Sequence, residues 1–250
     1  MTTIFAPYGE YEEIIDLLGE WKILDMKSLA EMISYELSYR KLMKRVRKLE
    51  NVGLIKSVLV GRKNKHIYLT EKGIQFTPYD FTSEIKPEQL THDLLVSRVL
   101  MTLLERPSFM AGKMFHQIEG NDIYPDAEVV GTRNSNSYKL AIEVEITQKS
   151  QDRVKQKYVK YGKADFFDFA FFITNKEPLY KTYKHYLESM TPKIQRRIVI
   201  AFDKKFTVLK ANLEKTKCFY LGNEVNFADI FGEDKGNLSG IKGTQTAPPP

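Results

Sequence analysis

The chain has 250 residues, of which 42% are hydrophobic and 28% charged, and its formal net charge is +6. No stretch approaches the roughly 18 consecutive apolar residues of a membrane span, and the first residues lack the basic and apolar regions of a secretory signal. Cys218 is the single cysteine, which excludes a disulfide framework and a cysteine-based zinc site. These features predict a cytoplasmic protein of one or two globular domains.

The charge is unevenly distributed over the first 65 residues. Residues 1–39 hold eight acidic and two basic residues, whereas residues 40–65 hold ten basic residues and the single acid Glu50. Positive charge concentrated in one short segment is typical of a surface that contacts nucleic acid.

Three helices are predicted in this first part of the chain. Segment 11–18 carries apolar residues at helical spacing, and residues 28–33 form a short second stretch with Ser28 in the N-cap position. The third helix is expected over 38–51, and Gly53 stands where a C′ glycine would end it.

A hairpin follows the helices. Two β-rich runs, 54–60 and 66–70, flank a polar turn that contains Gly61 and several bases. Three helices and then a hairpin with a basic tip is the winged-helix plan, and segments 49–55 and 68–73 resemble those of winged-helix regulators. The resemblance implies a DNA-binding domain, which we place at residues 1–76.

In a winged helix, the third helix presents its basic side to the major groove of DNA while the hairpin tip reaches phosphates. The predicted DNA-contact residues lie on these two elements: Arg40, Lys41, Lys44, Arg45, Arg47, Lys48, Arg62, Lys63 and Lys65. The alternatives are a basic face that only meets solvent, or a module that binds another protein.

Residues 77–90 interrupt the periodicity with two prolines and are expected to be a linker. The second domain is assigned to 91–233, and 234–250 to a disordered tail. The expected elements are a helix to 105, strands 113–118, 127–130 and 138–147, helix 150–162, strand 166–174, helix 179–190 and strand 197–202. This order predicts the α/β fold class with a mixed sheet, in which the apolar run 166–174 is a buried central strand.

Three carboxylates fall at related positions in this predicted sheet. Glu143 and Glu145 share one side of a strand because side chains alternate, and Asp126 opens the preceding strand. Converging carboxylates repel one another unless they are protonated, paired with bases or bridged by a cation. Oxygen-only ligands favour Mg²⁺ or Mn²⁺, so these three residues are candidate metal ligands and catalytic residues.

The pattern Asp126, then Glu143-x-Glu145, in this order of elements is similar to the PD-(D/E)XK, or restriction-endonuclease-like, superfamily. Glutamate occupies position 145, where that superfamily usually has lysine. Lys149, or Lys157 in the following helix, would then supply the catalytic cation. The resemblance implies a Mg²⁺-dependent endonuclease or nicking enzyme.

The string Glu143-Val144-Glu145-Ile146-Thr147, followed by residues such as Arg153, Lys157 and Tyr161 on one helical face, also resembles plasmid replication-relaxation proteins. His92 fits that pattern, and the resemblance covers about residues 10–175. It implies a winged helix joined to a restriction-endonuclease-like domain, which binds double-stranded DNA at the origin or promoter of a plasmid or other mobile element.

Two alternatives to catalysis stay open at this stage. The glutamates could pair with Arg153 and Lys157 as surface salt bridges, which contribute only ~0–1 kcal/mol and imply no chemistry. The second domain could then add DNA contacts or form a homodimer, as in a transcriptional regulator. No phosphate-binding loop of the Gly-x-x-x-x-Gly-Lys-Ser/Thr type is present, so no nucleotide cofactor is expected.

Overall fold

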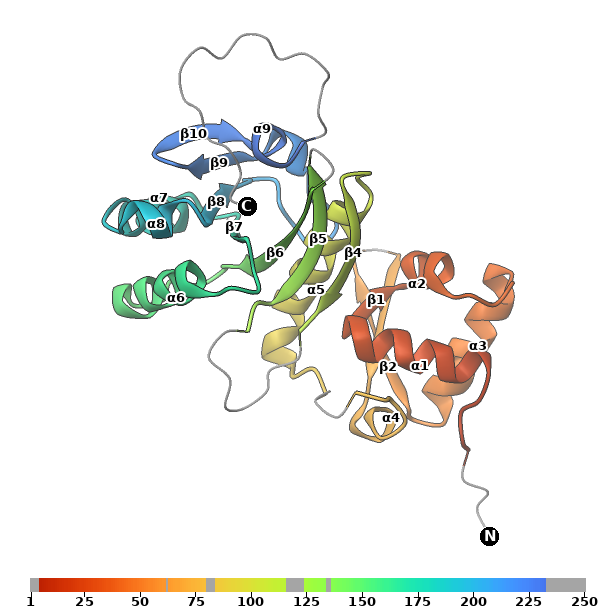
Figure 1. The fold of residues 1–250 in the computed structure, drawn as a ribbon. Helices are drawn as coiled ribbons and strands as arrows, with labels where there is room; N and C mark the ends of the chain where they lie inside the picture. Colours follow the sequence, from red (N-terminus) through yellow and green to blue (C-terminus); the bar gives the residue numbers. More distant parts are fainter. Residues whose placement is uncertain (1–4, 62, 80–83, 116–123, 134–135, 233–250) are drawn as a thin grey trace.

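The computed structural model describes residues 5–61, 63–79, 84–115, 124–133 and 136–232 (Figure 1). Its strands form a three-stranded sheet near the N-terminus and a seven-stranded mixed sheet in the rest of the chain. The predicted α/β fold class is therefore confirmed. Among the described residues, no helix combines the length and the apolar character that crossing a bilayer requires.

The first part of the chain contains the three predicted helices and the hairpin, together with two short elements that were not predicted, a strand before the second helix and a helix after the hairpin. Its elements are α1 (Glu10–Trp21), β1 (Ile23–Asp25), α2 (Met26–Met32), α3 (Tyr39–Asn51), β2 (Ile55–Val60), β3 (Asn64–Leu69) and α4 (Glu71–Ile74). Strand β3 lies between β1 and β2 and pairs antiparallel with both. A strand as short as β1 carries too little alternation to be recognised in the sequence.

Local capping explains where the helices begin and end. Helix α2 starts earlier than predicted because Asp25, and not Ser28, is its N-cap: the Asp25 carboxylate accepts hydrogen bonds from the backbone N–H groups of Lys27 and Ser28. Ser38 caps α3 in the same way. Gly53 has a φ of 75°, a left-handed conformation that favours glycine, and confirms the predicted end of α3.

The second part forms the seven-stranded sheet and its helices. Its elements are α5 (Pro87–Leu104), β4 (Phe109–Met114), β5 (Ala127–Arg133), β6 (Asn136–Val144), α6 (Gln151–Lys163), β7 (Phe169–Thr174), α7 (Glu177–Glu188), α8 (Pro192–Gln195), β8 (Ile198–Phe202), the 3-10 helix η1 (Leu213–Lys215), β9 (Lys217–Tyr220), β10 (Asn223–Asn226) and α9 (Phe227–Phe231). The strand order is β10-β9-β8-β7-β6-β5-β4, with parallel pairing only between β6, β7 and β8. Strand β7 is central, as predicted.

Some predicted boundaries differ from the observed ones. The strand expected at 113–118 is β4, which begins at Phe109 and ends at Met114. The central strand begins at Phe169, because Phe166 and Asp168 before it are exposed. The predicted tail lies outside the described residues.

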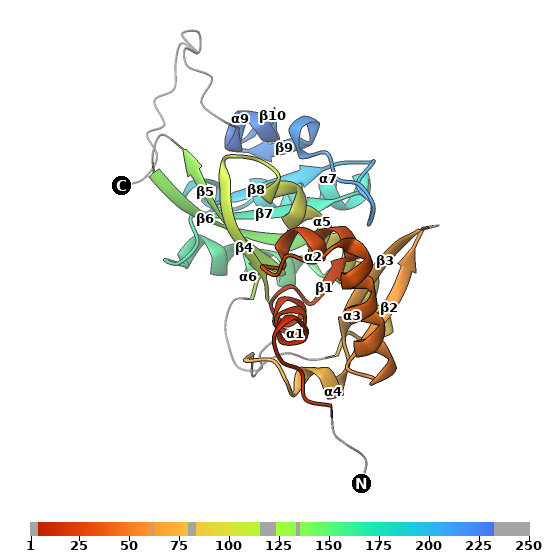
Figure 2. The same cartoon turned by 90° about the vertical axis from the view of Figure 1, so that its right-hand side faces the viewer.

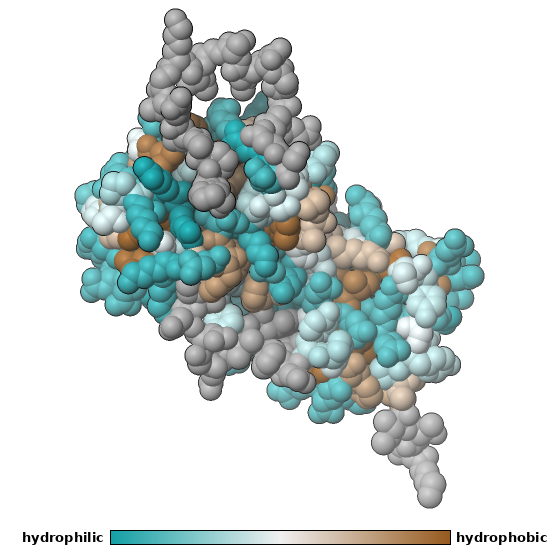
Figure 3. All heavy atoms as spheres, in the orientation of Figure 1, coloured by the Kyte–Doolittle hydropathy of each residue, from teal (hydrophilic) through white to brown (hydrophobic). Residues whose placement is uncertain are grey.

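Both faces of the seven-stranded sheet are buried. Leu140, Ile142 and Val144 of β6 face the core that α5 shares, whereas Ala141 of the same strand faces a second core formed with α6, α7 and α8. Figures 1 and 2 show α6 and α5 on opposite sides of the sheet. On the face drawn in Figure 3, hydrophobic residues appear as small patches between hydrophilic ones.

Helix α5 also packs against the first part of the chain. Its Leu94 joins Ile23 in a small apolar cluster under the three-stranded sheet. The Ser97 hydroxyl donates a hydrogen bond of 3.1 Å to the Ile23 carbonyl, and Arg98 lies 3.3 Å from the Asp25 carboxylate. One buried core runs from α1 through α5 to the seven-stranded sheet, so the two parts share their packing.

This shared core predicts cooperative unfolding of the chain. Trp21, the single tryptophan, is 4% exposed in the first part of the core. Thermal unfolding followed by Trp21 fluorescence and by far-ultraviolet circular dichroism should therefore give one coincident transition. Leu94→Ala should destabilise the chain by about 2–5 kcal/mol and lower both transitions together. A fluorescence transition well below the dichroism transition would contradict the shared core.

Candidate functional site

The sheet register brings the three predicted carboxylates to the same end of two neighbouring strands, where β5 begins and β6 ends. Glu143 is the penultimate residue of β6, and Glu145 follows its end and still pairs with Ile173 through the backbone. Asp126 comes directly before β5, and its Oδ2 accepts a hydrogen bond of 2.8 Å from the Val144 N–H. We call Asp126, Glu143 and Glu145 the carboxylate cluster.

Two lysines supply positive charge to the carboxylate cluster. The Lys157 ammonium, on α6, donates a hydrogen bond to Glu143 Oε2 and lies 3.8 Å from Glu145 Oε1. The Lys149 ammonium lies 2.7 Å from Glu145. The structure therefore places both predicted cations against the predicted acids, with Lys157 close to both glutamates.

Tyrosines occupy the remaining positions around the glutamates. The Tyr161 hydroxyl, one helical turn after Lys157, donates a hydrogen bond of 2.5 Å to Glu143 Oε1. The Tyr183 hydroxyl, on α7, donates one of 3.2 Å to Glu145 Oε2. Sequence reasoning missed Tyr183, since nothing in the chain near α7 points to β6. Arg153 is exposed and, within the described part of the chain, forms no hydrogen bond or ion pair with the cluster.

Burial shifts the proton affinities in the carboxylate cluster. Glu143 is 1% exposed, and its burial raises the pKa of its carboxyl to about 7, although Lys157 opposes the shift. For Lys157, burial favours the neutral amine, but the neighbouring carboxylates outweigh it and raise the ammonium pKa. Burial also raises the pKa of Tyr161 well above its ordinary value, so its hydroxyl stays protonated as a donor.

His92, at the N-terminal end of α5, provides a third cation. Its Nε2 lies 3.3 Å from Asp126 Oδ2 and 3.1 Å from the Val144 carbonyl oxygen, and its Nδ1 lies 3.4 Å from Asp93. Burial alone would lower the pKa of His92, but Asp126 and Asp93 outweigh it and raise the pKa to about 10. Burial likewise raises the pKa of Asp126, but His92 and Lys157 outweigh it and hold this pKa below its ordinary value.

The three carboxylates offer only oxygen ligands, which Mg²⁺ and Mn²⁺ prefer. The oxygens of the two glutamates, however, already take part in hydrogen bonds. Each carboxylate oxygen of Glu143 and Glu145 accepts a hydrogen bond from a lysine or a tyrosine. Among the described residues, no group of three or more His, Cys, Asp or Glu side chains could hold a metal ion. An ion held by all three carboxylates does not fit this arrangement, and binding of Mg²⁺ or Mn²⁺ stays a prediction.

The predicted DNA-contact residues divide into an exposed group and a paired group. The exposed bases of α3, which we call the basic face, are Arg40, Lys41, Lys44, Arg47 and Lys48. Lys63 at the hairpin tip is exposed as well, whereas Arg62 lies outside the described residues. Arg45 instead turns toward α1 and pairs with Glu10, with 2.6 Å between Nη2 and the carboxylate, and Lys65 pairs with Glu50 at 2.7 Å.

Of three comparisons with known proteins, only the comparison with solved structures finds matches, and these are distant. No protein-family profile matches the chain, and no curated protein matches it. Among solved structures, the type III plasmid segregation protein TubR is 22% identical, with 30% of this chain and 88% of TubR covered and a TM-score of 0.20.

The restriction endonuclease FokI is 10% identical over 70% of this chain and 40% of its own, with a TM-score of 0.24. FokI bound to DNA is 11% identical over 70% and 41%, with the same TM-score. The chain thus spans about two fifths of the FokI length.

The carboxylate cluster predicts how stability depends on Lys157. Lys157→Met should lower the free energy of unfolding by about 3–5 kcal/mol at pH 9, because it leaves the buried Glu143 carboxylate unpaired. The loss should be smaller at pH 6, below the Glu143 pKa of about 7, where a proton neutralises this side chain. A pKa raised in the folded state means that stability falls as the pH rises from the ordinary value toward 7. Urea unfolding at both pH values measures the effect.

Lys163→Met, on the exposed end of the same helix, is the matched control and should cost less than about 1 kcal/mol at either pH. Adding Glu143→Gln to Lys157→Met should remove most of the difference between the two pH values. A loss that is equal at pH 6 and pH 9 would show that Glu143 is not the group left unpaired.

Proposed function

We propose that the chain binds double-stranded DNA through a winged helix in its first part, as a protein of the replication-relaxation type acting at the origin or promoter of a plasmid or other mobile element. The observation that carries this proposal is the basic face of α3 beside the exposed Lys63 of the hairpin. Within the described part of the chain, Arg40, Lys41, Lys44 and Arg47 form no ion pair, so their charge is available to phosphates.

The packing of α3 supports this role. Leu42, Val46 and Leu49 are fully buried along one side of the helix, which fixes the opposite side toward solvent. The Arg45 guanidinium pairs with Glu10 and also lies over the Tyr11 ring at 5.2 Å, so it holds α3 against α1. A rigidly seated helix with a cationic outer side is the element that enters the major groove in helix-turn-helix proteins.

Removing three of these charges should weaken DNA binding. With about five phosphate contacts, a plot of the logarithm of the binding constant against the logarithm of the salt concentration should have a slope near −5. Arg40→Ala combined with Lys44→Ala and Arg47→Ala should raise the dissociation constant for a duplex more than tenfold and bring the slope closer to zero by about 3. Electrophoretic mobility shifts over a series of salt concentrations measure both quantities.

Lys163, Lys193 and Lys205 are exposed in the second part, and their replacement by alanine removes the same charge elsewhere. This control should bind duplex DNA nearly as well as the wild type does. Equal weakening by the two triple variants would attribute binding to net charge and not to the basic face.

A second candidate function is cleavage of DNA by the carboxylate cluster, as in a PD-(D/E)XK endonuclease or nicking enzyme. The observation in its favour is Lys157, whose ammonium contacts Glu143 and lies near Glu145. Under this proposal, Lys157 takes over the role of the lysine that the superfamily motif usually carries at position 145. A lysine there would offset charge that develops on a scissile phosphate. Without cleavage, the second part would serve a regulator as a dimerisation or DNA-contact domain.

Supercoiled plasmid incubated with Mg²⁺ or Mn²⁺ distinguishes these functions. If the cluster cleaves DNA, the wild type should produce relaxed or linear plasmid, and Glu143→Gln should reduce the rate at least about a hundredfold while it retains mobility-shift affinity. Circular dichroism confirms that the variant is folded. Intact plasmid over a range of substrates, together with tight duplex binding, would leave the binding function alone.

A further inference from the structure

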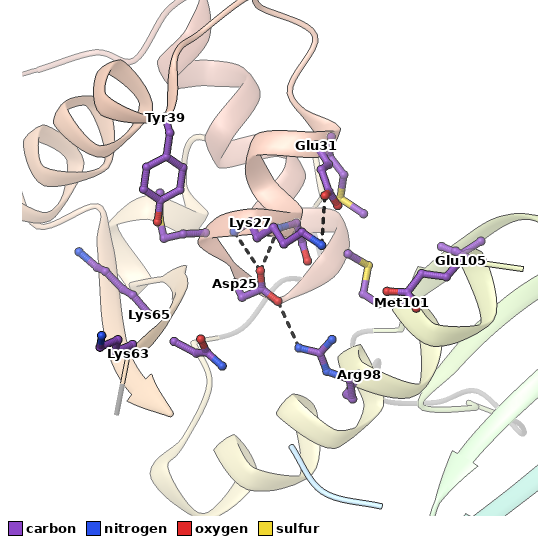
Figure 4. Close-up of a pocket in the computed structure, with 14 residues that line it drawn as sticks. Asp25, Lys27, Glu31, Tyr39, Lys63, Lys65, Arg98, Met101 and Glu105 are labelled. Carbon is purple, nitrogen blue, oxygen red and sulfur yellow. Dashed lines mark hydrogen bonds and ion pairs between the residues drawn. The ribbon is translucent and has the colours of Figure 1, made fainter. Parts of the chain in front are cut away.

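A cavity of about 380 Å³ lies between α2, the beginning of α3, the start of β3 and α5. Its volume is near the lower end of the roughly 300–1,000 Å³ range of ligand sites. Figure 4 shows that its lining combines side chains of both parts of the chain, among them Tyr39, Lys63 and Arg98. Neither the basic face nor the carboxylate cluster includes this cavity.

Most charges in the cavity are already compensated. The Asp25 carboxylate pairs with Arg98 at 3.3 Å and caps α2, and Lys27 lies 3.4 Å from Glu31. Lys63 is exposed at the hairpin end of the cavity and, within the described part of the chain, forms no ion pair. Its ammonium is therefore available to an anion that enters from the hairpin side.

Tyr39 is the first residue of α3 and points into the cavity from the α3 side (Figure 4). Its side chain is 57% exposed, a large apolar area to leave in water. It directly precedes Arg40 and Lys41 of the basic face. Tyrosine at such a position is typical of interface hot spots, because its ring buries apolar area while its hydroxyl can form a hydrogen bond.

The two sides of the cavity differ in charge. Lys63 and Lys65 line the hairpin side, whereas Glu105, which directly follows α5, lies on the opposite side beside Met101 (Figure 4). A carboxylate there repels phosphate, so a bound phosphodiester would stay on the side of Tyr39 and Lys63.

We propose that this cavity receives the sugar–phosphate backbone of one strand of duplex DNA, with Lys63 on a phosphate and the Tyr39 ring against a sugar or base. The inference rests on the proposed DNA-binding function and extends its interface beyond the basic face. A helix in the major groove and a hairpin at the neighbouring minor groove are separated by one backbone strand. That strand has to pass between α3 and the hairpin, where Tyr39 and Lys63 line the same side of the cavity (Figure 4).

Two substitutions test the two contacts separately, in mobility shifts with the full chain and a duplex over a series of salt concentrations. Tyr39→Ala should raise the dissociation constant about tenfold at every salt concentration, with an unchanged slope, because it removes an apolar contact and no charge. Lys63→Ala should bring the log–log slope closer to zero by about 1, because it removes one phosphate contact. Hydroxyl-radical footprinting should show the same sugars losing protection in both variants.

Tyr35→Ala is the matched control, since Tyr35 is 45% exposed just before α3 but does not line the cavity. It should bind as the wild type does. The inference is overturned if Tyr39→Ala and Tyr35→Ala bind alike, or if Lys63→Ala leaves the slope unchanged while the triple variant of the basic face reduces it. Failure of the wild type to bind duplex DNA would instead overturn the proposed function itself.

Discussion

Helix α5 has to bury apolar side chains on two sides, and this requirement positions both sheets and the residues around them. Leu95, Val99 and Leu103 belong to the large core of the seven-stranded sheet, whereas Leu94 packs under the three-stranded sheet with Ile23. A helix held from two sides has one position along its axis and one rotation about it. That position fixes His92 beside the carboxylate cluster and Arg98 beside the cavity at the hairpin.

Burial of charge imposes the second requirement. Moving a carboxylate out of water costs several kcal/mol unless a cation and hydrogen bonds offset the cost. The chain supplies a cation for each member of the carboxylate cluster: His92 for Asp126, Lys157 for Glu143 and Lys149 for Glu145. The cluster is therefore neutralised from within, and an ion or a phosphate that enters it has to compete with a lysine that is already in place.

The basic residues in the first part of the chain also fall into two kinds, those that form ion pairs and those whose charge is exposed to solvent. Arg45 and Lys65 hold helices and strands together through Glu10 and Glu50, whereas Arg40, Lys44 and Arg47 face solvent. Net charge counts all of them alike. The interface that we propose depends only on the second kind, together with Tyr39, an uncharged residue that the charge pattern could not reveal.

Local patterns in the sequence were enough to predict the α/β class, the third helix with its buried and basic sides, the hairpin and the central apolar strand. These features follow from periodicity, capping and turn residues that lie close together in the chain. The sequence also singled out Asp126, Glu143 and Glu145. The folded structure was needed to show that Lys157 and Lys149 both reach the glutamates, that Tyr183 joins them from α7, and that α5 is shared by both parts. Those contacts join residues far apart in the chain, and their register is set by strand pairing and by packing across the sheet, which no local pattern encodes.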